Sequence, residues 1–204
     1  MNIKKISLIL SVVIATILFS GCARQTEYIG MNSPNAAPMT MGIDRQDFEK
    51  AASDMVDSLL RSKALDKKGG GRYIVMMSDI VNDTTQRIDT RMLTKKIRIA
   101  IARSGKAVMT NAVGTERDDT TISTRQLRNN EEFDQRTIAK KGTLLNAELG
   151  LAGRILQRSA RTNDGDQLVE YYFQLELTNA RNGLVYWEDE TVVGKLGSNE
   201  TVTW

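Results

Sequence analysis

The sequence predicts one mixed α/β domain, in which a mixed sheet of about five strands has flanking helices in a three-layer-like arrangement and a C-terminal antiparallel meander. Three observations support this fold class. Two segments in the first half carry apolar residues at helical spacing, and an apolar run lies between them. The last third instead alternates apolar and polar residues, which is typical of half-exposed antiparallel strands. With 204 residues, the chain can bury a sizeable hydrophobic core.

The first predicted helix begins after Asp44, a favourable N-cap residue, and ends near Arg61, a cation that suits the last turn of a helix. Its apolar face is formed by residues at helical spacing: Phe48, Ala51, Ala52, Met55, Val56, Leu59 and Leu60. The second helix is predicted to begin after Asp89 or Thr90 and to stop at Gly105. Each helix therefore has one face to bury against a sheet.

The first predicted strand covers residues 73–80, which are apolar on both faces as in a central strand. Residues that favour turns follow at 81–85. A short strand is predicted from residue 107 to residue 110 or 113. The strand–helix–strand order predicts a parallel pair with a right-handed crossover.

The middle of the chain is strongly polar. Residues 114–130 are predicted to form either a mobile loop or a short helix capped at Ser123. A second short helix is predicted over residues 131–141, with Phe133 and Ile138 facing inward.

The sequence pattern of the last third of the chain predicts a meander of antiparallel strands. Residues 149–157 form a strand in which small residues, including Gly153, allow a neighbouring backbone or helix to approach closely. Residues 169–178 show the clearest alternation in the chain. Turns at 163–166 and 181–183 separate these strands and lead into the last one.

The N-terminal segment has the three parts of a secretory signal, which are Lys4 and Lys5, an uncharged apolar run over residues 6–19, and small residues before Cys22. At ~1.5 Å per residue the run covers roughly 21 Å, against a hydrocarbon core of about 30 Å. A retained transmembrane anchor is therefore the weaker alternative, together with an ordinary cleaved signal. The sequence around Cys22 resembles the lipobox of bacterial lipoproteins, which implies cleavage before Cys22 and acylation of that residue.

We therefore divide the chain into a lipoprotein signal peptide (1–21), a lipidated flexible tether (22–42) and a globular domain (43–204). The tether is polar and, at about 20 residues, reaches roughly 70 Å when fully extended. The residue after Cys22 is Ala23, whereas an Asp at that position would resemble a signal for retention in the inner membrane. The resemblance thus implies attachment to the outer membrane through Cys22, with the domain facing the periplasm.

Composition narrows the function classes. The chain has no histidine, and Cys22 is its only cysteine, so Ser-His-Asp and Cys-His catalysis, disulfides and Cys/His zinc sites are excluded. Removing Lys4 and Lys5 from the 28 basic side chains leaves 26 against 25 acidic ones, which gives no support for a nucleic-acid partner. We expect no catalytic residue, metal or cofactor. A Ser-Lys dyad, or a carboxylate pair such as Glu188 and Glu190, remains an enzymatic alternative.

Several short sequence motifs follow the lipobox. In their order along the chain they resemble those of the domain shared by the penicillin-binding-protein activator LpoB family and CsgG-like lipoproteins. The motifs are Asp79 to Thr84, Ser104 to Lys106, Asn146 to Ile155 and Asn182 to Trp187. The resemblance covers residues 44–193 and implies a non-catalytic domain. It also implies docking on a bifunctional penicillin-binding protein of the inner membrane and stimulation of that peptidoglycan synthase. The alternative is a CsgG-like or other envelope-assembly or secretion scaffold without a synthase partner.

Four arginines form the predicted partner surface: Arg117, Arg125, Arg128 and Arg136. They fall in the polar middle of the chain, and arginine is enriched at the energetic centres of protein interfaces. Ordinary solvated charges, next to the acidic residues of the same stretch, are the alternative interpretation.

Overall fold

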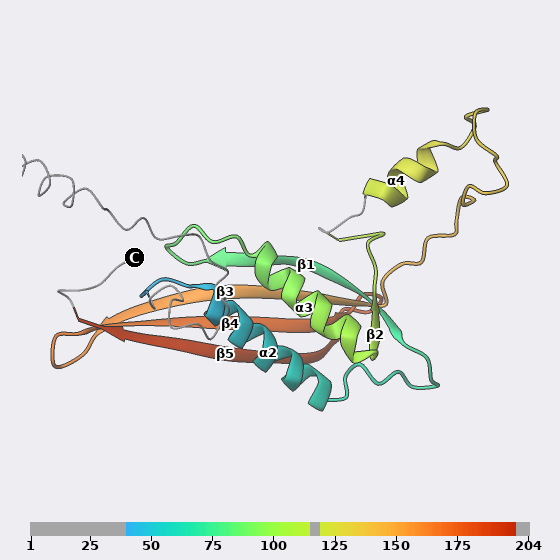
Figure 1. Cartoon of the computed structure of the whole chain (residues 1–204). Coiled ribbons are helices and arrows are strands. Elements are labelled where there is room, and N and C mark those ends of the chain that lie inside the picture. Colours follow the sequence, from blue (N-terminus) through green and yellow to red (C-terminus); the bar gives the residue numbers. More distant parts are fainter. Residues whose placement is uncertain (1–39, 115–118, 199–204) are drawn as a thin grey trace, which may run out of the picture. The chain divides into compact units, whose positions relative to one another are not determined.

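The computed structural model describes residues 40–114 and 119–198, and Figure 1 shows its helices and strands. In chain order these are α2 (Arg45–Arg61), β1 (Tyr73–Asp83), α3 (Arg91–Ser104), β2 (Ala107–Met109), α4 (Asp119–Gln126), β3 (Leu149–Arg161), β4 (Gln167–Asn179) and β5 (Val185–Gly197). The predicted signal peptide, Cys22, most of the predicted tether and Arg117 lie outside the described residues. The predicted mixed α/β fold class is confirmed.

The five strands form one sheet in the order β2-β1-β3-β4-β5. β1 is parallel to both β2 and β3. The pairs β3–β4 and β4–β5 are antiparallel and make the predicted C-terminal meander. The parallel β1–β2 pair, with α3 between its strands in the sequence, is also as predicted.

Both packed helices lie on the same face of the sheet (Figure 1). α3 contacts β1 and β2, whereas α2 contacts β5 and α3. On β1, Val75, Met77 and Ile80 are buried, whereas Ile74 and Met76 are only partly buried. The layering is therefore simpler than the three-layer-like arrangement predicted, because no described helix packs on the second face of the sheet. We call this second face the open face.

α2 begins and packs as its sequence predicts. Asp44 is its N-cap and forms a capping box with Asp47, in which each carboxylate accepts a hydrogen bond from the other residue's backbone N–H, at 3.2 and 2.8 Å. The predicted apolar face of α2 packs into the core. Within it, Phe48 meets Phe173 of β4 edge to face, with ring centroids 6.3 Å apart.

A chain of hydrogen bonds holds Met41 and Ile43, which precede α2, against the sheet. The Tyr171 hydroxyl of β4 donates to the carbonyl of Met41 at 2.8 Å and accepts from Gln86 Nε2 at 2.6 Å. Gln86 Oε1 accepts from the backbone N–H of Ile43 at 3.1 Å. Burial raises the pKa of Tyr171, and the bond from Gln86 partly opposes that shift. Because Met41 is buried in this way, the domain includes residues that the sequence assigned to the tether.

A buried lysine of β5 holds the same segment. Lys195 Nζ lies 2.5 Å from Asp47 Oδ2 and 3.2 Å from Asp44 Oδ2, and it donates to the carbonyl of Gly42 at 2.6 Å. Only 3% of the Lys195 side chain is exposed. We call these residues the Lys195 cluster. The cluster connects β5 to the start of α2.

The alternation along β4 is confirmed. Its inward residues are all buried: Val169, Tyr171, Phe173, Leu175 and Leu177. Beside them on β3, Gly153 allows the predicted close approach, because a Cβ there would lie 2.6 Å from a methyl carbon of Leu175 and 2.9 Å from the carbonyl oxygen of Gln174. A larger side chain at Gly153 would therefore separate β3 from β4.

α3 also has the predicted limits. Thr90 is its N-cap residue but makes no side-chain capping bond. The Asp89 carboxylate instead accepts from the backbone N–H of Arg91 at 3.0 Å. Gly105 ends the helix with φ of 69°, the left-handed conformation that favours glycine.

β1, β3 and β4 are longer than predicted, whereas β2 is shorter and ends at Met109. β1 continues to Asp83, although the residues after Ile80 favour turns. Val81 and Asp83 stay in the strand because they pair with Arg154 and Leu156 of β3. Cross-strand pairing therefore outweighs the local turn preference.

Candidate functional site

In the polar middle of the chain, the described residues include one short helix, α4, which has no buried residue. Ser123 lies inside this helix and does not cap it, so the predicted cap position is wrong. The helix includes Asp119, whose carboxylate suits the positive end of the helix dipole.

The helix predicted over residues 131–141 is wrong, because this stretch is a series of turns. Its polar side chains bind nearby backbone groups. Asn130 Oδ1 accepts from the N–H of Glu132, and Asp134 Oδ1 accepts from the N–H of Arg136, both at 3.0 Å. Such local bonds compete with the helical ladder. Phe133 is consequently 45% exposed.

Two of the predicted partner-binding arginines converge on one backbone segment. Arg125 Nη1 and Arg128 Nη2 both donate to the carbonyl of Lys140, at 3.2 and 3.1 Å. Arg128 Nε also donates to the carbonyl of Ala139 at 2.8 Å, and Arg125 Nη2 donates to Thr143 Oγ1 at 3.0 Å. These two side chains therefore hold the turns after α4 against the end of that helix.

Arg136 has a different partner. Its guanidinium forms an ion pair with Asp134, with Nη2 and Oδ2 2.9 Å apart. The side-chain and backbone hydrogen bonds from Arg136 hold the pKa of Asp134 below its ordinary value. The structure thus brings Arg125 and Arg128 together, while Arg136 binds a neighbour in the sequence and Arg117 lies outside the described residues.

The open face carries a second group of polar residues, of which the sequence singled out only Glu188 and Glu190, as a possible carboxylate pair. Strand register aligns Arg154, Gln174 and Glu190 in one row across β3, β4 and β5. The adjacent row has Glu176 directly opposite Glu188. The alternation of β4 and β5 places these glutamates on a solvated face, but only the register shows that they are neighbours.

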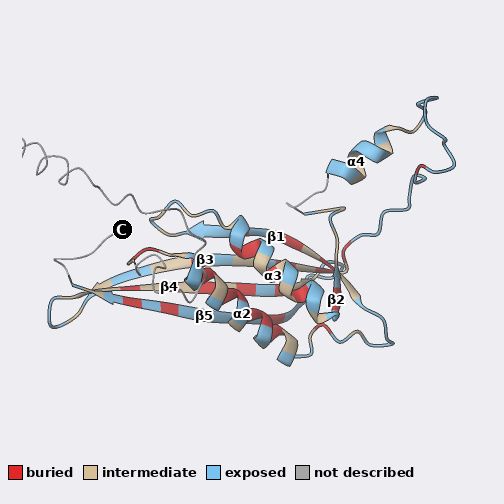
Figure 2. Ribbon diagram, in the orientation of Figure 1, coloured by how far each residue is buried: buried red, intermediate tan, exposed pale blue. Residues whose placement is uncertain are grey.

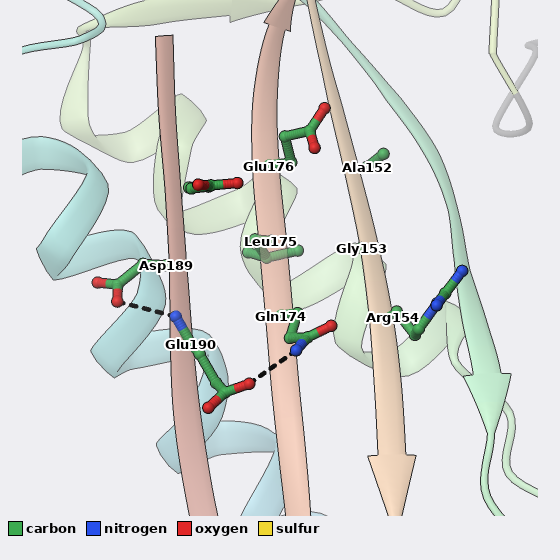
Figure 3. Close-up of a pocket in the computed structure, with 9 residues that line it drawn as sticks. Ala152, Gly153, Arg154, Gln174, Leu175, Glu176, Asp189 and Glu190 are labelled. Atoms are coloured by element: carbon green, nitrogen blue, oxygen red, sulfur yellow. Dashed lines mark hydrogen bonds between the residues drawn. The ribbon is translucent and has the colours of Figure 1, made fainter. Parts of the chain in front are cut away.

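These residues line a shallow hollow of about 470 Å³ on the open face (Figure 3). The lining residues are Ala152, Gly153, Arg154, Gln174, Leu175, Glu176, Glu188, Asp189 and Glu190. Figure 3 shows Gln174 bound to Glu190, with Nε2 donating to Oε2 at 2.7 Å. Ala152 is the small side chain that β3 contributes to the hollow, and carboxylates form much of its wall.

The glutamates of the hollow lack cationic partners within the described ranges. Glu176 accepts from the hydroxyl of Thr178 at 2.5 Å, and no Lys or Arg of those ranges forms an ion pair with Glu176, Glu188 or Glu190. Within residues 40–114 and 119–198, no group of three or more His, Cys, Asp or Glu residues could hold a metal ion. Among the same residues, no helix is long and apolar enough to cross a membrane.

The fold and these surfaces define a small mixed α/β domain with an open sheet face and an arginine-bearing segment at its surface. The family model described as peptidoglycan-synthase activator LpoB matches residues 47–193. The chain therefore belongs to the LpoB family, a family of activators and not of catalysts.

Solved structures of the same family are among those similar to this chain. The LpoB C-terminal domain from Salmonella enterica is 15% identical, with a TM-score of 0.43, and the match covers 72% of this chain and 98% of that domain. The corresponding Escherichia coli domain is 16% identical, with a TM-score of 0.40 and the same coverage. Lipoprotein GNA1162 from Neisseria meningitidis is 9% identical, with a TM-score of 0.37, over 64% of this chain and 87% of that one. No curated protein matches the sequence.

Proposed function

We propose that this chain is an outer-membrane lipoprotein that binds and activates a bifunctional penicillin-binding protein of the inner membrane, and so regulates peptidoglycan synthesis. The observation that carries the proposal is the family match, which spans residues 47–193 and thus nearly all of the described domain. The lipobox-like sequence at Cys22 supports attachment to a membrane, because acyl chains on one residue can anchor a domain stably.

An activator of this kind works by differential binding. A synthase that exchanges between a less active and a more active conformation shifts toward the state that the activator binds more tightly. Each tenfold difference in affinity between the two states shifts the equilibrium by about 1.4 kcal/mol. The domain needs no reacting group of its own for this role, only a surface that is complementary to the active state.

The tether limits where the partner can be bound. Because Met41 and Gly42 are held by Tyr171 and Lys195, at most residues 22–40 can serve as the tether. Fully extended, that length spans roughly 60 Å. The start of the domain must therefore lie within about this distance of the lipid anchor, and the bound synthase surface can be farther away by no more than the length of the domain.

Activation is the direct test. The mature protein, purified with its lipid anchor in detergent, should raise the rate of glycan polymerisation and of cross-linking by a bifunctional penicillin-binding protein from the same organism. The control is the same reaction without the lipoprotein. Unchanged rates would contradict the proposal, and ring-shaped oligomers of this chain, with no effect on the synthase, would favour an envelope-assembly scaffold.

Arg125 and Arg128, which are partly exposed, are the proposed contact for acidic groups of the synthase. Arg125→Glu combined with Arg128→Glu should weaken binding at least tenfold, because the reversed charges repel such groups and release the backbone of Ala139 and Lys140. Isothermal titration with the synthase measures the affinity. Circular dichroism should show a folded domain, since α4 buries no residue.

A matched control exists in the same chain. Arg87→Glu combined with Arg161→Glu makes the same charge change at two exposed positions outside the segment. If both double variants bind alike, the arginine segment is not the contact surface.

A further inference from the structure

The open face of β3, β4 and β5 is a surface that the arginine segment leaves unexplained. It is the face turned away from α2 and α3, the helices that lie in front of the sheet in Figure 2. On β5 the open-face residues are all exposed: Glu188, Glu190, Val192, Gly194 and Leu196. The face therefore combines charged and apolar side chains that are available for contact.

An apolar row lies next to the hollow. Register aligns Leu156, Tyr172 and Val192 across the three strands. Val192 is 43% exposed, and Leu196, further along β5, is 61% exposed. An apolar centre beside a polar rim is the usual anatomy of a protein interface.

The charges of the hollow are unbalanced. Glu176 and Glu188 stand directly opposite each other on adjacent strands, an arrangement that destabilises a sheet. Glu190 adds a third carboxylate in the next row, against a single Arg154. A cationic group placed in the hollow would remove this repulsion, so the charge pattern favours a basic partner.

We infer that the open face is a second docking surface, which binds a positively charged patch of the synthase in which Lys or Arg side chains flank an apolar side chain. This inference rests on the proposed function and specifies its partner chemistry. The cations lie among Glu176, Glu188 and Glu190, and the apolar side chain packs on Tyr172 and Val192. The arginine segment and the open face then bind groups of opposite charge on the partner.

Neutralising the three glutamates tests this assignment. The triple variant Glu176→Gln, Glu188→Gln and Glu190→Gln should bind the synthase at least tenfold more weakly than the unaltered protein. Its stability to urea should be equal or higher, because the change removes like-charge repulsion. Loss of binding without loss of stability is the expected signature. The association rate of the unaltered protein should also fall more steeply with salt than that of the triple variant.

The control removes the same charge elsewhere. Asp57→Asn, Asp66→Asn and Asp164→Asn lie at exposed positions outside both the open face and the arginine segment and should leave the affinity within about twofold. Val192→Ser, which alters only the apolar row, should weaken binding without changing its dependence on salt.

The outcomes separate the two proposals. If the unaltered lipoprotein does not bind the synthase, the proposed function fails. If it binds and the triple glutamine variant binds equally well, the open face is not a docking surface. If the variant changes only the mass of the lipoprotein in solution, the face binds a second copy of this chain, and the inference about the synthase is overturned.

Discussion

Replacing Lys195 with methionine should lower the free energy of unfolding by about 3–5 kcal/mol, the usual effect of removing one partner of a buried ion pair. Lys195 Nζ is within 3.2 Å of two carboxylates and one carbonyl, and its side chain is 3% exposed. Without the ammonium group, Asp47 stays buried as an uncompensated charge. Asp44 loses a partner at the same helix end, so both the first turn of α2 and its contact with β5 should loosen.

Urea denaturation of the purified domain measures this loss. Lys50→Met is the matched control, since Lys50 pairs with Asp54 at the surface with 60% of its side chain exposed, and it should cost less than about 1 kcal/mol. Adding Asp47→Asn to Lys195→Met should recover part of the stability, because it removes the unpaired charge. A loss below about 1 kcal/mol for Lys195→Met would show that the cluster contributes little.

Replacing Phe173 with alanine should cost about 3–5 kcal/mol, as expected for deleting a buried aromatic ring. Phe173 is 2% exposed and packs edge to face on Phe48, at an interplanar angle of 76°. The ring therefore fills space between β4 and α2, and its removal leaves a cavity that the sheet cannot close. The midpoint of urea unfolding, followed by circular dichroism, reports the change.

Phe133→Ala is the control for this prediction. Phe133 is 45% exposed in the turns after α4, so its truncation should change stability by no more than about 0.5 kcal/mol. A double-mutant cycle with Phe48→Leu and Phe173→Leu should give a coupling of about 0.5–1.5 kcal/mol for the aromatic pair. Equal losses for Phe133→Ala and Phe173→Ala would contradict the position of Phe173 in the core.

Elements with a strong local pattern were predictable from the sequence. The apolar spacing of α2 and α3 and the alternation of β4 follow directly from which side of each element is buried. Their end signals are local as well: Asp44 caps α2, and Gly105 stops α3. The helix predicted over residues 131–141 is wrong because the Asn130 and Asp134 side chains bind the backbone there.

The contact residues were only partly predictable. Composition placed the arginines in a polar stretch, but it could not show that Arg125 and Arg128 meet at the carbonyl of Lys140. Nor could it show the hollow, since Glu176 and Glu188 lie on consecutive strands and become direct neighbours only through the register of β4 and β5. Sequence patterns assign a residue to a face, whereas register depends on the partner strand.

The sequence by itself determined the fold class, the limits of the two packed helices, the inward face of β4 and the resemblance to the LpoB family, because each depends on local spacing or on short phrases. Only the tertiary structure decided that both helices lie on one face, that Lys195 is buried against α2, and that three glutamates face one hollow. These features arise from contacts between different elements of the fold. Because side chains alternate along a strand, the register that buries one set of residues also fixes which residues are neighbours on the opposite face of the sheet.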